Sequence, residues 1–321
     1  MSKSEPRGQY VRNENQLEMS EAMDSSQISL TVDTGRSERQ SETIDVQYYT
    51  AGDEDEKGSE NREMRPPIVL LHGIGLDAAK VSFRRAIPAL AQNRRVIALD
   101  FPGHGESEKP DVRYTTAFYR AVFERFLASL GLESVSLIGT SMGGSVALGY
   151  ALDAPETVRR LVLVNSYGLG GDAPWRAAAS IALRWPGVGS LLWGTSTETR
   201  AAVRASLQGL VGRTVPDDLV EDVYRIVQKP NVGRALTRWQ RSEFRLSGLK
   251  TDYTSQLADL TVPTLFVHGT ADPILPAQWS TRAAQRSPHA TLELINGCGH
   301  WTAREKPETF NQIVTRFVDL D

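Results

Sequence analysis

The sequence predicts an α/β fold, in which a mostly parallel, doubly wound sheet carries an inserted helical cap. Three observations lead to this prediction. Short apolar runs such as Ile68-Val69-Leu70-Leu71 are typical of strands that are covered on both faces. These runs alternate with segments of helical length, which indicates parallel crossover connections. From about residue 168 to residue 257 the alternation stops, and helix-like segments follow one another without a convincing strand.

The composition narrows the class of protein. With 321 residues the chain suits one large domain that carries an insertion. Hydrophobic residues make up 40% of the chain and the formal net charge is -3, as in ordinary soluble globular proteins. No basic excess indicates a nucleic-acid partner. We therefore expect a small-molecule substrate.

Cysteine usage and hydropathy bear on the compartment. The single cysteine, Cys298, excludes a disulfide within the chain and a multi-cysteine metal site, which fits a reducing compartment. Residues 1–23 lack the apolar core of a signal peptide, and no apolar run reaches the roughly eighteen residues that a membrane span requires. We expect a cytoplasmic protein with no membrane span.

The first elements are a tail and a hairpin. Residues 1–26 are polar and rich in Ser, Glu, Asn and Gln, and we predict that they form a flexible tail. Residues 27–33 and 43–51 have strand character and are joined by a charged turn, which predicts an edge hairpin. The core is then predicted at 27–167 and 258–321, and the cap at 168–257.

The remaining elements follow from apolar runs for strands and from the 3.6-residue period for helices. Strands are predicted at 68–71, 95–99, 158–164, 262–267 and 290–295. Helices of the core are predicted at 81–92, 115–130, 277–285 and 307–319. Helices of the cap are predicted at 175–185, 197–211 and 217–228.

The stretch 135–149 predicts a buried strand, a tight turn and a buried helix, with Ser141 at the apex. Gly139, Ser141 and Gly143 form the pattern Gly-x-Ser-x-Gly. We expect glycine there because a Cβ at either flanking position would collide with a neighbouring strand or helix. Such a bend exposes the hydroxyl and places the N–H of Met142 at a helix start, where developing negative charge is stabilised. A plain glycine-rich connection is the alternative.

Two later loops supply partners for the serine. A serine hydroxyl is a weak nucleophile until a base takes its proton, and that base needs an acid that holds its tautomer. Asp272 follows the strand at 262–267, and His300 follows the strand at 290–295. Because the carboxyl ends of parallel strands meet at one edge, we expect both near Ser141. Alternatively, Asp272 only caps the helix after it.

Several motifs together resemble α/β-hydrolases with a helical cap. His72-Gly73 resembles their oxyanion loop, residues 100–107 resemble their Asp-x-Pro-Gly-x-Gly-x-Ser loop, and Gly299-His300 resembles their histidine loop. The chain order of serine, aspartate and histidine is also the order of that fold. The resemblance extends from about Gln27 to the C-terminus.

This resemblance implies roles for the site residues. Ser141 would be the nucleophile, His300 the general base and later acid, and Asp272 the orienting carboxylate. The oxyanion hole would consist of the backbone N–H groups of Met142 and Ile74. Backbone geometry, more than these two side chains, would then decide how well the transition state is stabilised.

The nucleophile limits the reaction. Serine at this position argues against dehalogenase and epoxide-hydrolase reactions, which use a carboxylate. Acyl transfer to water remains, through an acyl-enzyme on Ser141 that His300-activated water hydrolyses. We predict a small, largely apolar carboxylic ester as the substrate. The sequence shows no metal-ligand spacing and no phosphate-binding glycine loop, so we expect no metal and no cofactor.

A narrower resemblance points to carbon–carbon bond hydrolysis. Residues 139–144, 168–170 and 298–301 resemble meta-cleavage product hydrolases, which cleave vinylogous diketo acids. That family usually has asparagine at the position of Thr140 and a longer glycine-rich loop at residues 74–77, where the acidic head of the substrate would bind. Thr140 and Trp301 are the candidate pocket residues. A carbon–carbon hydrolase and a non-catalytic small-molecule-binding protein stay open as alternatives.

The apolar side chains of the predicted cap allow two interpretations. They either line an apolar substrate pocket or form the cap's own core. The residues concerned are Trp175, Ile181, Leu183, Trp185, Leu191, Leu192 and Trp193.

Overall fold

The computed structural model describes residues 23–34, 41–52, 65–173, 176–182, 185 and 187–320. Its main sheet has the strand order β1-β2-β4-β3-β5-β6-β9-β10, and β2 runs antiparallel to both of its neighbours. The predicted mostly parallel sheet with an edge hairpin is therefore confirmed. The strands are β1 (Asp24–Asp33), β2 (Ser41–Ala51), β3 (Ile68–Leu71), β4 (Val96–Leu99), β5 (Val135–Thr140), β6 (Val158–Val164), β9 (Thr264–Gly269) and β10 (Ala290–Ile295).

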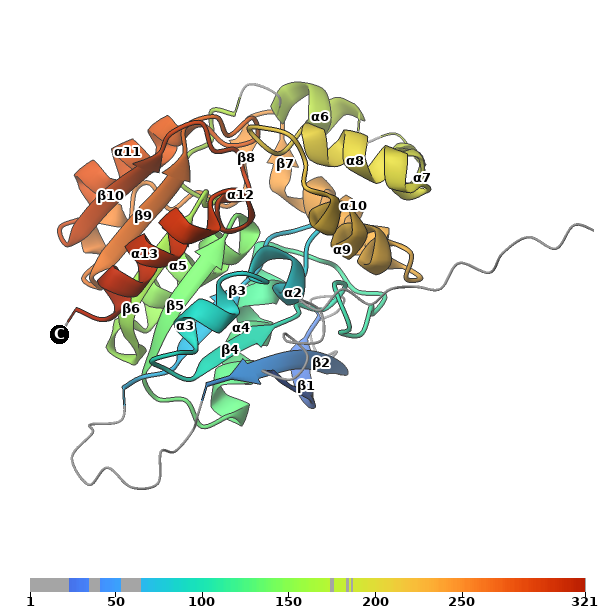
Figure 1. Cartoon of the computed structure of the whole chain (residues 1–321). Helices are drawn as coiled ribbons and strands as arrows, with labels where there is room; N and C mark the ends of the chain where they lie inside the picture. Colours follow the sequence, from blue (N-terminus) through green and yellow to red (C-terminus); the bar gives the residue numbers. More distant parts are fainter. Residues whose placement is uncertain are drawn as a thin grey trace, which may run out of the picture.

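Helices cover both faces of the sheet (Figure 1). Successive side chains of a strand point to opposite faces, so both sets are buried under helices. In β3, Val69 and Leu71 belong to one hydrophobic cluster, whereas Ile68 and Leu70 belong to another. The sheet is therefore doubly wound, as predicted. The first cluster includes residues of α4 (Thr116–Ser129), α5 (Met142–Asp153) and α11 (Ala277–Arg286). The second includes residues of α3 (Ile87–Leu90) and α13 (Pro307–Val318).

A helical cap is inserted between β6 and β9 and lies over one edge of the sheet (Figure 1). Because parallel strands end at the same edge, the loops after β3, β5, β6, β9 and β10 line one cavity together with the cap. The predicted insertion of a helical cap is therefore confirmed. Its helices are α6 (Arg176–Ala182), α7 (Val188–Thr197), α8 (Arg200–Gln208), α9 (Asp217–Val227) and α10 (Val232–Glu243).

The core of the cap lies between α8 and α9. Val203 and Leu207 of α8 and Leu219 and Val223 of α9 are fully buried in one cluster. Trp301, which follows the candidate histidine, packs into the same cluster. The cap is therefore joined to the sheet through apolar packing as well as through the chain.

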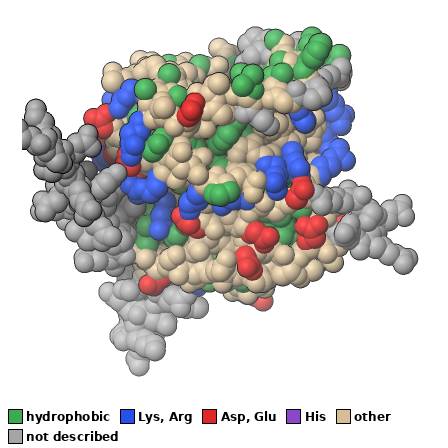
Figure 2. Space-filling view, turned by 90° about the vertical axis from the view of Figure 1, so that its right-hand side faces the viewer, with side chains coloured by type: hydrophobic (Ala, Val, Ile, Leu, Met, Phe, Trp, Pro, Cys, Tyr) green, Lys and Arg blue, Asp and Glu red, His purple; other side chains and the backbone are tan. Residues whose placement is uncertain are grey.

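Most of the candidate apolar side chains in and between α6 and α7 lie outside that core, although Trp193 of α7 packs against it. Four of the residues that the sequence offered for it are more than half exposed: Ile181, Trp185, Leu191 and Leu192. Figure 2 shows the side of the molecule that lies at the right in Figure 1. Hydrophobic side chains gather at the top of that side, at the height of α6 and α7. The interpretation as cap core is therefore wrong for these four, and Trp175 and Leu183 lie outside the described residues.

The N-terminal strand begins earlier than predicted. β1 starts at Asp24, so the last residues of the predicted tail belong to the sheet, where residues 24–26 pair with residues 48–50. Backbone pairing does not require apolar side chains, which is why hydrophobic pattern missed them. Residues 1–22, the rest of the predicted tail, lie outside the described part of the chain.

Two further local predictions differ from the structure. The helix predicted at 81–92 is split into α2 (Ala79–Ser82) and α3, because Pro88 lies in the first turn of α3 and lacks the N–H needed to continue a helix. The cap also contains a hairpin of β7 (Phe244–Arg245) and β8 (Gly248–Leu249), which is too short to show a strand period. None of the described helices has the length and apolar character needed to cross a membrane.

The loop at 100–107 is held in place by the buried carboxylate of Asp100. One carboxylate oxygen accepts the N–H of Ala79 (2.8 Å), and the other accepts the N–H of Glu106 (2.9 Å) and the hydroxyl of Tyr49 (3.1 Å). Burial and the neighbouring Asp100 charge raise the pKa of Tyr49, so the phenol stays a donor. In turn, His104 of this loop accepts the N–H of Gly75 (3.1 Å). The loop therefore supports the segment after β3.

Asp100→Ala is expected to lower the free energy of unfolding by about 3 kcal/mol, because it leaves three donors without their acceptor. Urea denaturation measures the change. Glu106→Ala is the matched control in the same loop, since the Glu106 side chain is 56% exposed and only pairs with Lys229. We expect it to cost less than about 1 kcal/mol. Equal losses in both variants would contradict the role of Asp100.

Candidate active site

Ser141 lies at the sharp bend between β5 and α5. Its φ of 53° and ψ of -119° fall in a region that residues with a Cβ rarely adopt. The surrounding backbone maintains this conformation: the Ser141 N–H donates to the carbonyl oxygen of Val164, and its carbonyl oxygen accepts the N–H of Tyr167, both at 3.0 Å. Strain of this kind persists only where the neighbouring structure enforces it.

The two flanking glycines allow this bend. A Cβ on Gly139 would lie 2.5 Å from the carbonyl oxygen of Gly143, and a Cβ on Gly143 would lie 2.5 Å from the carbonyl oxygen of His72. The first collision is with the following helix and the second with the end of β3. Both agree with the reason for which the sequence predicts glycine at these positions.

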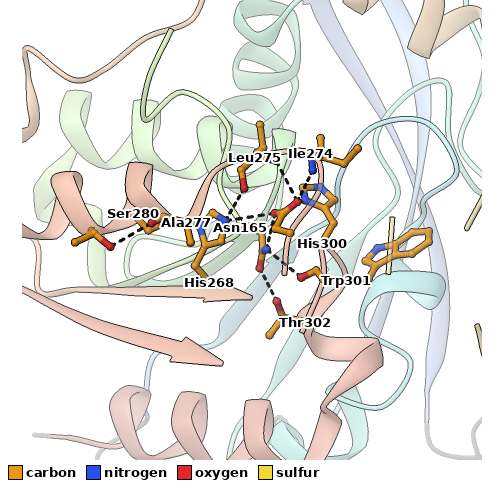
Figure 3. Close-up of polar contacts among 12 residues, drawn as sticks. Asn165, His268, Ile274, Leu275, Ala277, Ser280, His300, Trp301 and Thr302 are labelled. Carbon is orange, nitrogen blue, oxygen red and sulfur yellow. Dashed lines mark hydrogen bonds and ion pairs between the residues drawn. The ribbon is translucent and has the colours of Figure 1, made fainter. Parts of the chain in front are cut away.

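Asp272 and His300 are joined by a short hydrogen bond. His300 Nδ1 donates to Asp272 Oδ2 at 2.8 Å, and the Asp272 side chain is fully buried. Because a carboxylate only accepts, Nδ1 carries the proton in the neutral ring, which leaves Nε2 as a basic nitrogen. Asp272 Oδ1 accepts the N–H groups of Ile274 (2.8 Å) and Leu275 (3.1 Å), as Figure 3 shows.

Asn165 is the residue at this centre that sequence reasoning missed. It follows β6 with a φ of 43° and is fully buried. Its Nδ2 donates to Asp272 Oδ2 (2.7 Å) and to the carbonyl oxygen of Gly299 (3.2 Å), and its Oδ1 accepts the hydroxyl of Thr302 (Figure 3). Asn165 therefore connects the loops of Asp272 and His300. The available signal was an asparagine directly after a buried strand, which tolerates positive φ.

His268 closes the other side of the carboxylate. Its Nε2 lies 3.1 Å from the carbonyl oxygen of Leu275 and 3.3 Å from Asp272 Oδ2, while Nδ1 lies 2.7 Å from the hydroxyl of Ser280. Since a carbonyl oxygen can only accept, Nε2 must carry a proton. His268 thus supplies another donor to Asp272 and orients its loop (Figure 3).

The electrostatics of the pair follow from these contacts. Burial by itself raises the pKa of Asp272, but the charge of His300 and the hydrogen bonds from His268 and His300 outweigh it and hold the pKa well below its usual range. Burial lowers the pKa of His300, but the charge and hydrogen bond of Asp272 outweigh it, so the net direction is upward. Asp272 is therefore a carboxylate at neutral pH, and His300 is a stronger base than an exposed histidine.

The two predicted oxyanion donors lie beside Ser141. Met142 is the first residue of α5, and Ile74 follows Gly73, on which a Cβ would lie 3.2 Å from that of Ser141. Within the described residues, neither the Met142 N–H nor the Ile74 N–H has a hydrogen-bond acceptor in the chain. Free N–H groups at a helix start can stabilise an anion, which is what an oxyanion hole requires.

Asp77 anchors the loop that carries Ile74. Its Oδ2 accepts the N–H of Gly73 (2.8 Å) and the hydroxyl of Ser82 (2.7 Å), and its Oδ1 accepts the N–H of Ala78 (2.8 Å). The residue is 3% exposed and lines the same cavity as Ser141. The sequence distinguishes this position only as part of the short loop at residues 74–77.

A cavity of about 420 Å³ lies between the sheet edge and the cap. Ser141, His300 and both predicted pocket residues, Thr140 and Trp301, line it. Its walls are mostly apolar, and no lysine or arginine is found among the described residues that line it. The apolar contributors include Leu76, Leu192, Trp193, Leu236, Trp239 and Phe244.

The structure brings Ser141 and His300 to one cavity, and no hydrogen bond joins the two side chains within the described part of the chain. Hydrogen bonds between a nucleophile and its base are often long before substrate binds, and they shorten in the complex with substrate. Across the described ranges, no group of three or more His, Cys, Asp or Glu side chains is arranged to hold a metal ion. The arrangement supports acid–base and nucleophilic chemistry at Ser141.

Comparison with known proteins gives a consistent group of relatives. The family profile described as alpha/beta hydrolase fold matches residues 66–307. A 2-hydroxymuconate semialdehyde hydrolase of Pseudomonas putida is 33% identical over 260 residues, which cover 78% of this chain and 86% of that protein. A 2-hydroxy-6-oxo-2,4-heptadienoate hydrolase of P. putida is 29% identical, with coverages of 78% and 88%.

Solved structures of hydrolases have a similar fold over most of the chain. A serine hydrolase involved in carbazole degradation has a TM-score of 0.70 and 25% identity, and the match covers 92% of this chain and all of that one. A membrane phospholipase A has a TM-score of 0.69 at 23% identity, with coverages of 92% and 86%, and shares the fold.

Asp272→Asn is expected to reduce stability more at about pH 5.5 than at about pH 9. The folded pKa of His300 lies above the unfolded value of about 6.5, so the stabilising contribution of the charged pair is present below that value and is lost as the pH rises through the folded pKa. The pKa of Asp272 is held low, so this residue is a carboxylate at both pH values and the difference reports on the pair.

Urea unfolding at the two pH values measures this loss, which should differ by more than about 1 kcal/mol. Asp153→Asn is the control, since Asp153 is exposed on the surface beside Arg120. A loss for Asp272→Asn that does not depend on pH would show that Asp272 does not stabilise the charged form of His300.

Proposed function

The chain belongs to the α/β-hydrolase fold family, and we propose that it is a serine hydrolase that cleaves a small, largely apolar and uncharged carboxylic ester through an acyl-enzyme on Ser141. One observation carries the proposal. Ser141 is held in a strained bend at an apolar cavity. His300 lines the same cavity and is hydrogen-bonded to the buried carboxylate of Asp272. Nucleophile, base and orienting acid are the parts that acyl transfer requires.

In the proposed reaction, Ser141 Oγ attacks the acyl carbonyl carbon while His300 Nε2 takes the hydroxyl proton. The N–H groups of Ile74 and Met142 donate to the oxygen that becomes negative, and loss of one such donor typically costs about 3 kcal/mol. His300 then gives the proton to the departing alcohol. Water, deprotonated by His300, attacks the acyl-enzyme and releases the acid. Asp272 holds the ring tautomer throughout.

The charge of the cavity favours an uncharged substrate. Asp77 lines the cavity beside the oxyanion loop, and the described lining includes no lysine or arginine. A carboxylate on the substrate would therefore approach a buried negative charge with no lysine or arginine in the described lining to pair with it, which is unfavourable in a poorly solvated site. An ester with an apolar acyl group avoids this repulsion.

A carbon–carbon hydrolase is the second candidate, and the relatives favour it. Two of them are named for cleaving 2-hydroxymuconate semialdehyde and 2-hydroxy-6-oxo-2,4-heptadienoate, and the second name denotes a carboxylate. Thr140, where meta-cleavage hydrolases usually have asparagine, and the short loop at residues 74–77 count against the same substrates here. The charge of Asp77 adds to these differences.

Ser141→Ala is expected to lower kcat for p-nitrophenyl butyrate by about 10⁴-fold or more, because it removes the hydroxyl that forms the proposed acyl-enzyme. A fluorophosphonate probe should label wild-type protein at Ser141, which intact mass and peptide mapping would show, and should not label the variant. Turnover that survives the substitution would contradict the serine mechanism. Binding of esters without turnover or labelling would instead support the non-catalytic alternative.

Asp77→Asn should relax the preference against charged substrates. We compare p-nitrophenyl butyrate with the p-nitrophenyl monoester of succinic acid, which has the same number of acyl carbons and adds a carboxylate. Wild type should have the higher kcat/KM for the butyrate. The ratio of kcat/KM for the butyrate to kcat/KM for the succinate ester should fall about tenfold in Asp77→Asn. Because each ratio is measured within one variant, a partial loss of folded enzyme cancels.

Asp153→Asn, which makes the same change in charge on the surface, is the control and should leave the ratio unchanged. A wild-type preference for the succinate ester, or faster cleavage of a vinylogous diketo acid than of any ester, would favour the carbon–carbon hydrolase.

A further inference from the structure

Every amide N–H from Gly299 to Trp301 has an acceptor, and one of these acceptors lies in the cap. The His300 N–H donates to the carbonyl oxygen of Leu210 (2.8 Å), which lies in the connection between α8 and α9 of the cap. The N–H groups on either side, of Gly299 and Trp301, donate to the carboxylate of Glu305 at 2.9 and 3.1 Å. Three consecutive amides thus have defined acceptors, and one of these acceptors belongs to the cap.

Glu305 binds the cap as well as the histidine loop. Its Oε2 accepts the N–H of Gly212 in the cap at 2.8 Å, in addition to the N–H of Gly299. The carboxylate is 1% exposed, and the guanidinium of Arg213 donates to the Glu305 backbone carbonyl oxygen. A buried carboxylate that loses one of its donors is penalised, because water cannot replace the donor. The loop and the cap therefore share one acceptor.

The two backbones are in direct contact at a pair of glycines. A Cβ on Gly212 would lie 2.8 Å from the N of Gly299 and 3.0 Å from the carbonyl oxygen of Gly297. A Cβ on Gly299 would collide with the backbone of Gly212 and Val211. Any larger side chain at either glycine would separate the cap from the histidine loop.

The residue before Glu305 strengthens the same junction. Arg304 is 4% exposed, and its Nη1 donates to Asp222 Oδ2 of α9 (3.0 Å) and to the carbonyl oxygen of Val81 (2.8 Å). Asp222 also accepts Arg84 Nη1 at 2.6 Å. Arg304 and Glu305 both belong to the short helix α12 (Thr302–Glu305), which directly follows the histidine loop. One turn of helix thus joins the cap at two points.

We propose that Glu305 is a positioning residue for His300, and that through Gly212 it makes the position of the catalytic base depend on the docked cap. The inference rests on the proposed function, since it takes His300 as the base. When the cap is docked, the amides of residues 299–301 and 212 are all satisfied. When the cap shifts, His300 loses the acceptor of its N–H and Glu305 loses a donor, so the imidazole is no longer held against Asp272.

Gly212→Ala tests the junction while leaving the side chains of the triad and of Glu305 unaltered. Its Cβ pushes the cap loop away from Gly299, so kcat should fall, by up to about 100-fold, since displacement of a reacting group by about 1 Å has effects of that size. KM should stay within about twofold of wild type. The fall should be equal for p-nitrophenyl acetate and hexanoate, because a misplaced base affects every acyl length.

Gly194→Ala is the matched control in the cap, since nothing lies within 4 Å of a Cβ there. It should leave both constants unchanged. Glu305→Gln is the second variant: it keeps the shape but replaces one acceptor oxygen with an amide donor, and it should lower kcat in the same way. Thermal unfolding identifies a variant that fails to fold. A raised KM confined to the hexanoate, with kcat unchanged, would show that the junction only shapes the pocket and would overturn the proposal.

Hydrogen exchange gives a readout that does not depend on activity. Peptides that cover residues 297–301 should exchange faster in Gly212→Ala than in wild type, and not in Gly194→Ala. Unchanged exchange at these residues in Gly212→Ala would overturn the coupling. If wild type neither hydrolyses esters nor reacts with the fluorophosphonate, the proposed function fails, while the exchange result still decides whether the cap holds this loop.

Discussion

The buried carboxylate of Asp272 is the interaction on which the candidate site depends. It accepts hydrogen bonds from its own loop, from Asn165 at the end of β6 and from His300 after β10. Burial alone would favour the neutral acid, but these donors make the ionised form the stable one, as the lowered pKa indicates. Three loops that end three neighbouring strands are thereby fixed to one another. Side chains on loops acquire the rigidity of the sheet, which acid–base chemistry requires.

The cavity shows how one fold can serve different substrates. The bend at Ser141 is enforced by the flanking glycines and the surrounding backbone, whereas the charge near the oxyanion loop is a local property of Asp77. Asp77 contributes to the loop through three hydrogen bonds and to the cavity through its charge. A single buried carboxylate therefore holds the loop and also places its charge at the cavity wall.

Buried acidic side chains also determine how the cap is attached. Asp222 accepts Arg84 and Arg304 of the core, Glu305 accepts the N–H of Gly212, and Glu243 of α10 accepts the Tyr167 hydroxyl (3.3 Å). Buried charges must keep their partners, so these contacts specify one orientation of α8 to α10. The exposed apolar side chains of α6 and α7 impose no such constraint. Polar contacts therefore align the cap with the catalytic edge, in addition to the apolar packing around Trp301.

The local sequence pattern was sufficient to predict the doubly wound sheet, the bend at Ser141 and the loops that carry Asp272 and His300. These features depend on burial on two faces, on the helix period and on turn residues, all of which are properties of residues close together in the chain. Only the tertiary structure decided which side chains support them. Asn165 meets Asp272 across 107 residues, and Glu305 meets Gly212 across 93. An isolated asparagine or glutamate in a sequence looks like many solvated ones; its role arises when folding removes water and leaves particular donors in reach.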